Sequence, residues 1–187
     1  RPRDELVERL HEAVSSLGDM LDEASTRARD PGEAEQHGPT PLAPLAYRVA
    51  AIFGARAEQK GIDLQVRVRA ASRSGVGPSI LRDAVENLVS NALKFCRSGD
   101  SVRVIVDTID GDAVISVKDS GPGIPIAEHG RLFHPRSRLS PRPTGGEPSS
   151  GLGLWLTHGA ITRAGGSVEL ESRPGQGSEF RLRLPRS

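Results

Sequence analysis

The sequence feature that most limits the fold is a pair of alternating apolar runs on either side of a short polar turn. Val102, Val104 and Val106 occupy every second position of one run, and the second run, with Val114, Ile115 and Val117, follows the turn at 110–112. A period of two is typical of a strand with one buried face, and an Asp-Gly turn between two such runs indicates a β-hairpin. The chain is therefore expected to contain a sheet with one covered face.

Further helices and strands alternate along the rest of the chain. Residues 125–150 have little apolar periodicity and are rich in Pro, Ser, Gly and Arg, which predicts a long loop that serves as a lid or stays disordered. The pattern predicts an α+β fold, with helices on one face of a mixed, largely antiparallel sheet. Helices are expected at 42–60, 79–96 and 152–164, and further strands at 62–68, 167–172 and 178–184.

The first part of the chain differs in charge from the rest. Residues 1–37 carry five Arg against ten Asp or Glu, whereas the remainder carries twenty basic against fourteen acidic residues. Apolar residues recur at steps of three and four between Leu6 and Ala24, which predicts a helix within 1–30. Its apolar stripe needs a partner helix, a second copy of the chain, or a site on its own domain. Residues 31–41 are expected to be a linker to a domain at 42–187.

Composition excludes several classes of protein. Twenty-five basic and twenty-four acidic residues give a net charge of +1, so no overall field favours binding to nucleic acid. Cys96 is the only cysteine, which rules out an intramolecular disulfide and a cysteine-based zinc cage and fits a reducing, cytoplasmic compartment. No stretch is long and apolar enough to span a membrane, although a membrane anchor elsewhere in a longer parent protein stays open.

One cluster of polar residues falls on the predicted helix 79–96. Asn87, Asn91 and Lys94 share a face of this helix, with Phe95 beside them. Two carboxamides on one face can bind a hydrated Mg²⁺ or phosphate oxygens without repelling an anionic ligand. Taken alone, the same pattern also fits an ordinary solvated helix face.

Three further clusters combine glycine with charged or polar residues. Asp119 follows a strand and precedes Gly121 and Gly123, an arrangement in which a carboxylate can accept a hydrogen bond from an adenine amine, or which forms a simple turn. Residues 149–154 place glycines before a helix, whose free N–H groups suit phosphate. The loop between these clusters is rich in arginine, including Arg138, and could clamp a polyphosphate or merely be exposed.

In this order, the four clusters resemble the ATP-binding catalytic domain of sensor histidine kinases, in the superfamily that includes gyrase and the heat-shock chaperone ATPases. Residues 87–95 resemble that family's N box, 119–124 its first glycine box, 131–133 its F box and 151–154 its second glycine box. The resemblance covers about 38–187 and implies a two-layer α/β sandwich of the Bergerat type. It also implies that the helix within 1–30 is the second helix of a dimerisation and phosphoacceptor hairpin.

The resemblance assigns expected roles to individual residues. Asn91 would bind Mg²⁺, Asn87 and Lys94 would contact the phosphates of ATP, and Asp119 would bind the adenine amine with support from Ser178. Arg138 falls at the lid arginine of the family, and with Asn87 and Lys94 it is expected to serve phosphoryl transfer. The remaining nucleotide-binding residues would be Phe95, Gly121, Gly123, Ile124, Phe133, Ser150, Gly151, Leu152, Gly153 and Leu154.

Position 87 bears on the reaction. Hydrolytic relatives carry a Glu four residues before the metal-binding Asn, where it activates water, whereas this chain has Asn87. An amide cannot act as that base, so slow hydrolysis and transfer of the γ-phosphoryl group to a histidine are expected. Glu86 should face away, because one residue turns a helix by about 100°. His11 lacks the motif of an acceptor, so the acceptor histidine is expected outside this chain.

Three functions therefore stay open at this point. The leading one is a histidine kinase catalytic domain that uses ATP and Mg²⁺, with a response-regulator receiver domain as a further partner. The second is a degenerate, non-catalytic nucleotide-binding signalling module, and the third is a true ATPase. Two departures from the family pattern bear on the lid: Arg136 stands where a second aromatic residue is usual, and Ser149 where a glycine is frequent.

Overall fold

The computed structural model describes residues 38–135, 137, 140–145 and 151–186. The helix expected within 1–30 and most of the linker lie outside the described residues. Two of the expected site residues, Arg138 and Ser150, also lie outside them. The described residues include the sheet, its helices and the other expected site residues.

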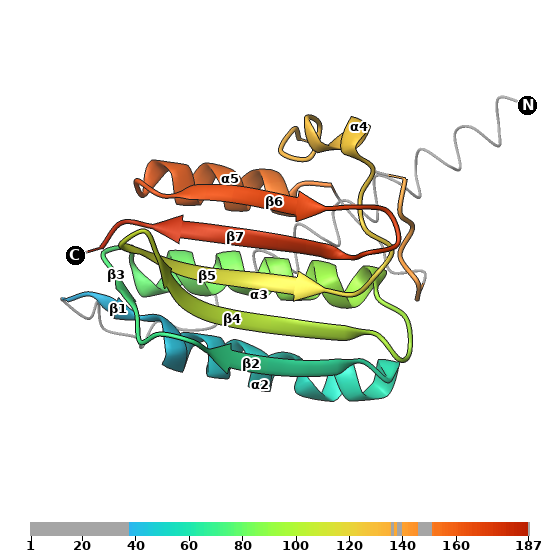
Figure 1. Cartoon of the computed structure of the whole chain (residues 1–187), viewed down its shortest axis with the longest axis horizontal. Coiled ribbons are helices and arrows are strands. Elements are labelled where there is room, and N and C mark those ends of the chain that lie inside the picture. Colours follow the sequence, from blue (N-terminus) through green and yellow to red (C-terminus); the bar gives the residue numbers. More distant parts are fainter. Residues whose placement is uncertain (1–37, 136, 138–139, 146–150, 187) are drawn as a thin grey trace, which may run out of the picture.

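A single five-stranded sheet forms one layer of the domain (Figure 1). Its strand order is β2-β4-β5-β7-β6; β2 pairs with β4 in parallel, and the other neighbours are antiparallel. The expected mixed, largely antiparallel sheet is confirmed. The strands are β2 (Asp63–Val68), β4 (Ser101–Ile109), β5 (Asp112–Asp119), β6 (Ser167–Ser172) and β7 (Ser178–Leu184).

The predicted hairpin lies at the centre of this sheet. Strands β4 and β5 pair from Val102 opposite Asp119 to Ile109 opposite Asp112, with Asp110 and Gly111 as the two-residue loop. Both loop residues have positive φ, 51° and 89°, as a type I′ turn requires. Because Asn, Asp and Gly tolerate this conformation best, the Asp-Gly pair fixes the register of the hairpin.

Three helices cover one face of the sheet and form the second layer (Figure 1). They are α2 (Leu42–Lys60), α3 (Pro78–Phe95) and α5 (Gly153–Arg163). Helix α3 lies at the middle of this layer and turns a continuous apolar side to the sheet, with Leu81, Val85 and Leu88 buried. The inward residues of the strands complete the core; they include Val104, Val106, Ala113, Ile115, Val117, Phe180, Leu182 and Leu184. The α+β, two-layer prediction is confirmed.

Short elements were missed by the sequence analysis. Thr40–Pro41 (β1), at the end of the expected linker, pairs with Arg73–Ser74 (β3), and the hydroxyl of Thr40 donates to the carbonyl of Val76 at 2.7 Å. The expected loop 125–150 contains a one-turn helix, α4 (Ile126–His129). Elements of two to four residues are too short to show a hydrophobic period, so they leave no pattern in the sequence.

No helix among the described residues has the length and apolar character needed to cross a bilayer.

Candidate functional site

Asn87, on the polar side of α3, faces α5 rather than open solvent. The side-chain amide of Asn87 donates through Nδ2 to the hydroxyl of Thr157 on α5, at 2.8 Å. Asn91, one turn later, is partly buried, and so are Lys94 and Phe95 at the end of the helix. The solvated-face alternative for Asn87 is therefore excluded by its contact with a second helix.

The second glycine cluster meets this face at the start of α5. A Cβ atom added to Gly153 would collide with Oδ1 of Asn87. Glycine is therefore required here so that the first turn of α5 can approach the amide closely. Residues 87 and 153, which are far apart in the sequence, therefore lie side by side.

Asp119 ends β5 with a carboxylate held by backbone donors. Its Oδ1 accepts the N–H of Gly121 at 2.9 Å and the N–H of Ser178 at 3.3 Å. Burial raises the pKa of Asp119 to about 6, although the two N–H groups pull it downward; the charge of Asp100 adds a smaller upward effect. Both hydrogen bonds go to the same oxygen, which fixes the orientation of the carboxylate.

The first glycine cluster is shaped by the hairpin that joins β6 to β7. Gly123 has φ +68°, and a Cβ atom there would strike the carbonyl of Arg173. The N–H of Gly175 donates to the carbonyl of Pro122 at 2.7 Å. This loop therefore needs glycine for packing against protein backbone, in addition to any approach to a ligand.

Cys96 joins the α3 cluster to the Asp119 cluster. It follows α3 directly, its side chain is buried, and a Cβ atom on Gly121 would lie 3.2 Å from its Sγ. Burial and the nearby Asp119 raise the pKa of Cys96 to about 12, so it is a packed thiol rather than a nucleophile. The two clusters therefore adjoin at the end of α3.

Two apolar residues of the F box, Leu132 and Phe133, anchor the loop that follows α4. Leu132 is buried, and the ring of Phe133 stacks on the imidazole of His158 from α5, with centroids 4.6 Å apart and an interplanar angle of 25°. The loop is thus attached to α5 by an aromatic contact. Ile124, at the other end of α4, is also buried.

Three residues that hold the site were not identified from the sequence. Thr157 fixes the amide of Asn87, and Cys96 links the two clusters. Ser172 accepts the N–H of Ile124 at 2.8 Å, and its Oγ lies 2.8 Å from the carbonyl of Gly177 and 3.0 Å from the hydroxyl of Ser178. Thr157 lies one helical turn after Gly153, and Ser172 is the register partner of Ser178, so both could have been found from spacing.

Glu86 is directed elsewhere, as expected. Its Oε1 lies 4.0 Å from Nε of Arg82 on the same helix, whereas the neighbouring Asn87 contacts α5. Burial raises the pKa of Glu86, and Arg82 partly offsets this effect. Glu86 is therefore not in the position of a base that faces Asn91 and Gly153.

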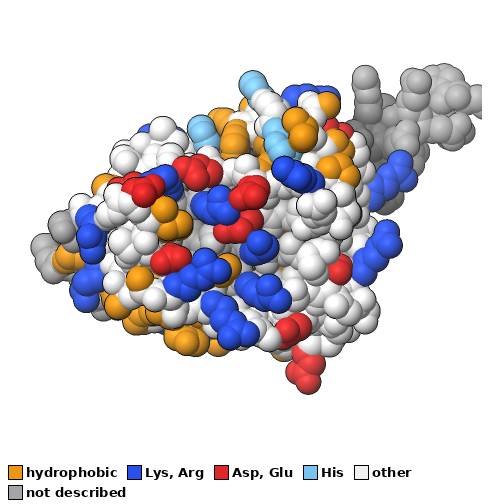
Figure 2. Space-filling model, viewed as in Figure 1, with side chains coloured by type: hydrophobic (Ala, Val, Ile, Leu, Met, Phe, Trp, Pro, Cys, Tyr) orange, Lys and Arg blue, Asp and Glu red, His pale blue; other side chains and the backbone are white. Residues whose placement is uncertain are grey.

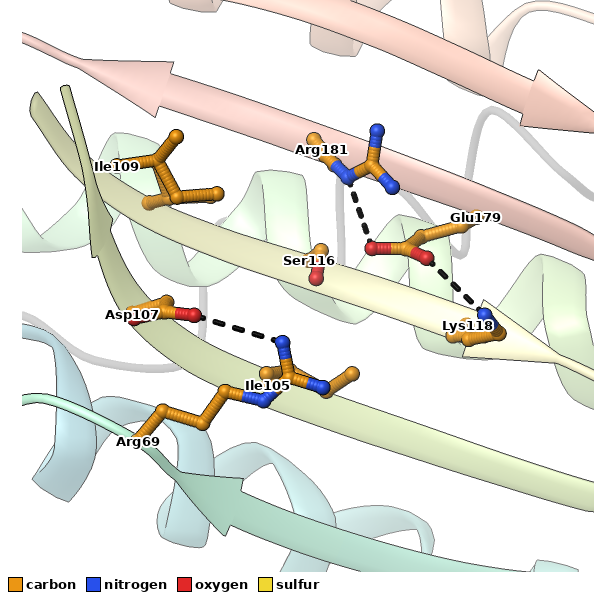
Figure 3. Close-up of a pocket in the computed structure, with 9 residues that line it drawn as sticks. Arg69, Ile105, Asp107, Ile109, Ser116, Lys118, Glu179 and Arg181 are labelled. Atoms are coloured by element: carbon orange, nitrogen blue, oxygen red, sulfur yellow. Dashed lines mark hydrogen bonds and ion pairs between the residues drawn. The ribbon is translucent and has the colours of Figure 1, made fainter.

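A hollow on the outer face of the sheet, away from the helices, is a less suitable site. Figure 2 shows that this face carries interspersed cationic and anionic side chains. Around the hollow they pair with each other (Figure 3): Arg69 with Asp107 at 3.5 Å, and Glu179 with Lys118 at 3.4 Å and Arg181 at 2.8 Å. Because these cations are already paired with carboxylates, the hollow offers no unpaired positive charge to an anionic ligand among the residues drawn in Figure 3.

Comparison with protein families gives a match over the part of the chain that holds the site. Residues 76–187 match the family described as "Histidine kinase-, DNA gyrase B-, and HSP90-like ATPase". The sensor protein CutS of Streptomyces coelicolor is 33% identical over 159 residues, which cover 84% of this chain and 38% of CutS. The adaptive-response sensory kinase SasA of Prochlorococcus marinus is 32% identical over 187 residues, or 97% of this chain and 47% of SasA. The chain thus spans less than half the length of these two curated relatives.

Solved structures show the same fold. A mycobacterial sensor histidine kinase, MprB, superposes with a TM-score of 0.71 and 26% identity over 80% of this chain and 98% of that one. Full-length ShkA in complex with AMPPNP superposes with a TM-score of 0.73 and 26% identity, over 100% of this chain and 39% of ShkA.

Proposed function

Because the chain belongs to the family of histidine kinase-, DNA gyrase B- and HSP90-like ATPases, we propose that it is the catalytic domain of a sensor histidine kinase. In this proposal it binds Mg·ATP and transfers the γ-phosphoryl group to a histidine on a dimerisation hairpin of the parent protein. The names of its relatives, a sensor protein and a sensory kinase, support this choice within the family. The observation that supports the proposal best is that the second half of α3 brings the two clusters together: Asn87 contacts Thr157 and Gly153, and the held carboxylate of Asp119 adjoins Cys96 at the end of the helix.

The adenine end of the nucleotide is assigned to Asp119. Because Oδ1 is occupied by two backbone N–H groups, Oδ2 is available to accept a hydrogen bond from an exocyclic amine. A buried carboxylate gains more from such a donor than an exposed one, since it has already lost much of its hydration. Ile124 and Leu154 would provide the apolar wall against the base, with Phe95 beside it.

The phosphates are assigned to the polar face of α3 and the start of α5. Lys94 supplies a cation, and residues 151–153 supply backbone N–H groups at a helix N-terminus. The amide oxygen of Asn91 would hold a Mg²⁺ that neutralises charge on the phosphates. Among the described residues no group of three His, Cys, Asp or Glu side chains is placed to hold a metal ion, so the fit relies on the amide and on the phosphates of the substrate.

The chemistry of position 87 favours transfer over hydrolysis. A water-activating base is replaced by an amide whose Nδ2 is already bonded to Thr157, and Glu86 is directed toward Arg82. Phosphoryl transfer requires mainly positioning and charge neutralisation, which the site can supply without a base for water. A nitrogen of the acceptor imidazole is itself the nucleophile, so no group of this chain has to activate water.

The test mixes this chain with a separate phosphoacceptor hairpin and radiolabelled ATP. Label on the hairpin histidine supports a kinase. Binding of ATP without transfer would favour a non-catalytic signalling module, and repeated release of phosphate without a hairpin would favour an ATPase. Asn91→Ala should abolish the transfer while leaving the thermal unfolding of the nucleotide-free protein nearly unchanged, since the amide is not part of the core.

The wider assembly follows from the same proposal. The helix within 1–30 would join a homodimer, and the phosphoryl group would pass from the histidine to a response-regulator receiver domain. The domain would act in the cytoplasm, whether or not its parent protein is anchored in a membrane.

A further inference from the structure

The last turn of α3 is held by groups from two other parts of the chain. Carbonyl groups at the end of a helix have no partner within it, and they fray unless something else bonds to them. Here Nζ of Lys60, the final residue of α2, donates to the carbonyl of Leu93 at 2.7 Å. The same ammonium group donates to the hydroxyl of Thr144 at 3.0 Å.

Thr144 bonds to two more of these carbonyls. Its backbone N–H donates to the carbonyl of Lys94 at 2.9 Å. Its hydroxyl lies 2.8 Å from the carbonyl of Cys96 and 3.1 Å from that of Lys94. A hydroxyl has one proton, so it donates to one of these carbonyls at a time while it accepts from Lys60.

Four residues earlier, the same segment is attached to α4. The N–H of Ser140 donates to Oε2 of Glu128 at 2.9 Å, and its hydroxyl donates to Oε1 of the same carboxylate. Between Ser140 and Thr144 stand Pro141 and Pro143, whose rings fix φ and reduce the freedom of the backbone. We call residues 140–144 the strap; it ties α4 to the end of α3 and leads through Gly145 toward the second glycine cluster.

We propose that Thr144 is a positioning residue for the nucleotide: its hydroxyl holds the strap on the end of α3 and so fixes the turn that presents Lys94 and Phe95. This inference rests on the proposed function, because those two residues are assigned to ATP. Lys94 and Phe95 lie in the turn whose carbonyl groups Thr144 and Lys60 bond. When the strap is detached, the carbonyl groups of Lys94 and Cys96 lose their bonds to Thr144, and the protein must reorder this turn before ATP binds.

The expected change in ATP affinity depends on the fraction of molecules in which the strap is attached. If only a fraction of molecules has the competent arrangement, the observed dissociation constant rises in inverse proportion to that fraction. The net value of one hydrogen bond corresponds to a factor of about 2 to 12 in such an equilibrium. Because Thr144 is exposed, the low end of this range applies, and Thr144→Val is expected to weaken binding by about two- to threefold.

The experiment compares variants that differ in one hydroxyl. Thr144→Val keeps the shape and the backbone N–H but removes the hydroxyl, whereas Thr144→Ser keeps the hydroxyl. Thr40→Val is the matched control, because it also removes a threonine hydroxyl bonded to a carbonyl, at β1 and away from the site. The affinity for a non-hydrolysable ATP analogue is measured by calorimetry, and KM for ATP and kcat are measured in transfer to the hairpin.

The expected pattern separates positioning from stability. Thr144→Val should raise the dissociation constant and KM with kcat nearly unchanged, Thr144→Ser should restore both, and Thr40→Val should change only thermal stability. Wild-type affinity in Thr144→Val would overturn the inference and leave the proposed function in place. Failure of the wild-type chain to bind the analogue would overturn the proposed function, and the inference with it.

Discussion

Replacement of Asp119 by Asn should make the protein more stable and less able to bind ATP. The carboxylate is ionised at neutral pH although burial raises its pKa from an ordinary value of 3.8 to about 6. At about 1.4 kcal/mol for each pH unit, this difference means that the ionised group costs the folded state up to about 3 kcal/mol. An Asn side chain has the same shape and keeps an oxygen for the N–H groups of Gly121 and Ser178. It therefore removes the cost and keeps the bonds.

The same change should damage the nucleotide site. With its oxygen held by the two backbone donors, the amide presents NH₂ where the carboxylate presents Oδ2. The NH₂ group of Asn would then face the exocyclic amine of adenine, and two hydrogen-bond donors cannot bond to each other. We expect binding of an ATP analogue to fall by at least tenfold in a protein whose unfolding free energy has risen.

The difference in unfolding free energy between Asp119→Asn and wild type should depend on pH. A carboxyl group with a raised pKa destabilises the folded state above about pH 6, and this penalty disappears as the pH falls from 6 toward 4. Urea unfolding at pH 4.5 and pH 7.5 should therefore show a small difference between Asp119→Asn and wild type at the lower pH and a larger one at the higher. An equal or lower stability of the variant at pH 7.5 would refute the reasoning. In the wild type, affinity for ATP should fall below about pH 6, because the protonated acid offers a weaker acceptor.

Three further substitutions test the supports of the site. Gly123→Ala should lower the unfolding free energy by about 2 kcal/mol or more, because the added Cβ atom meets the backbone of Arg173. The control is Gly175→Ala, since Gly175 also has a positive φ but no atom lies within 4 Å of an added Cβ, so its loss should be much smaller. Equal unfolding midpoints of the two variants in urea would contradict the packing argument. Thr157→Val should cost about 1–3 kcal/mol and weaken ATP binding by releasing the amide of Asn87, while Thr157→Ser should restore both in calorimetry; unchanged binding in the Val variant would remove that role. Ser172→Ala should cost a similar amount by leaving a buried N–H without its acceptor, and an unaltered melting temperature would count against it.

The sequence was sufficient for the fold where the signals were local and repeated. The valine alternation of 102–106 and the Asp-Gly turn predicted the central hairpin, and the spacing of apolar residues predicted α2, α3 and α5 within one or two residues of their ends. These elements depend on periodicity and on backbone conformations available to few residues. The helices cover the face of the sheet to which the alternating valines 102, 104 and 106 point, and these valines belong to the core.

The supporting contacts of the site were not predicted from the sequence, because they join segments that are far apart in the chain. The partner of Asn87 is Thr157, seventy residues away on α5, and only its position one helical turn after Gly153 relates it to the site in the sequence. The glycine at 123 is required by the backbone of a different hairpin, which a motif alone cannot reveal. The strap from Ser140 to Thr144 lies in a segment without periodicity, so its attachment to α3 emerged only from the three-dimensional arrangement.

The central claim is tested most directly by calorimetric titration of this chain with a non-hydrolysable ATP analogue in the presence of Mg²⁺. We predict saturable binding at one site per chain, competed by ADP, and lost in Asn91→Ala although that variant unfolds at the wild-type temperature. Absence of any binding heat at millimolar analogue, or binding that Asn91→Ala leaves unchanged, would contradict the account.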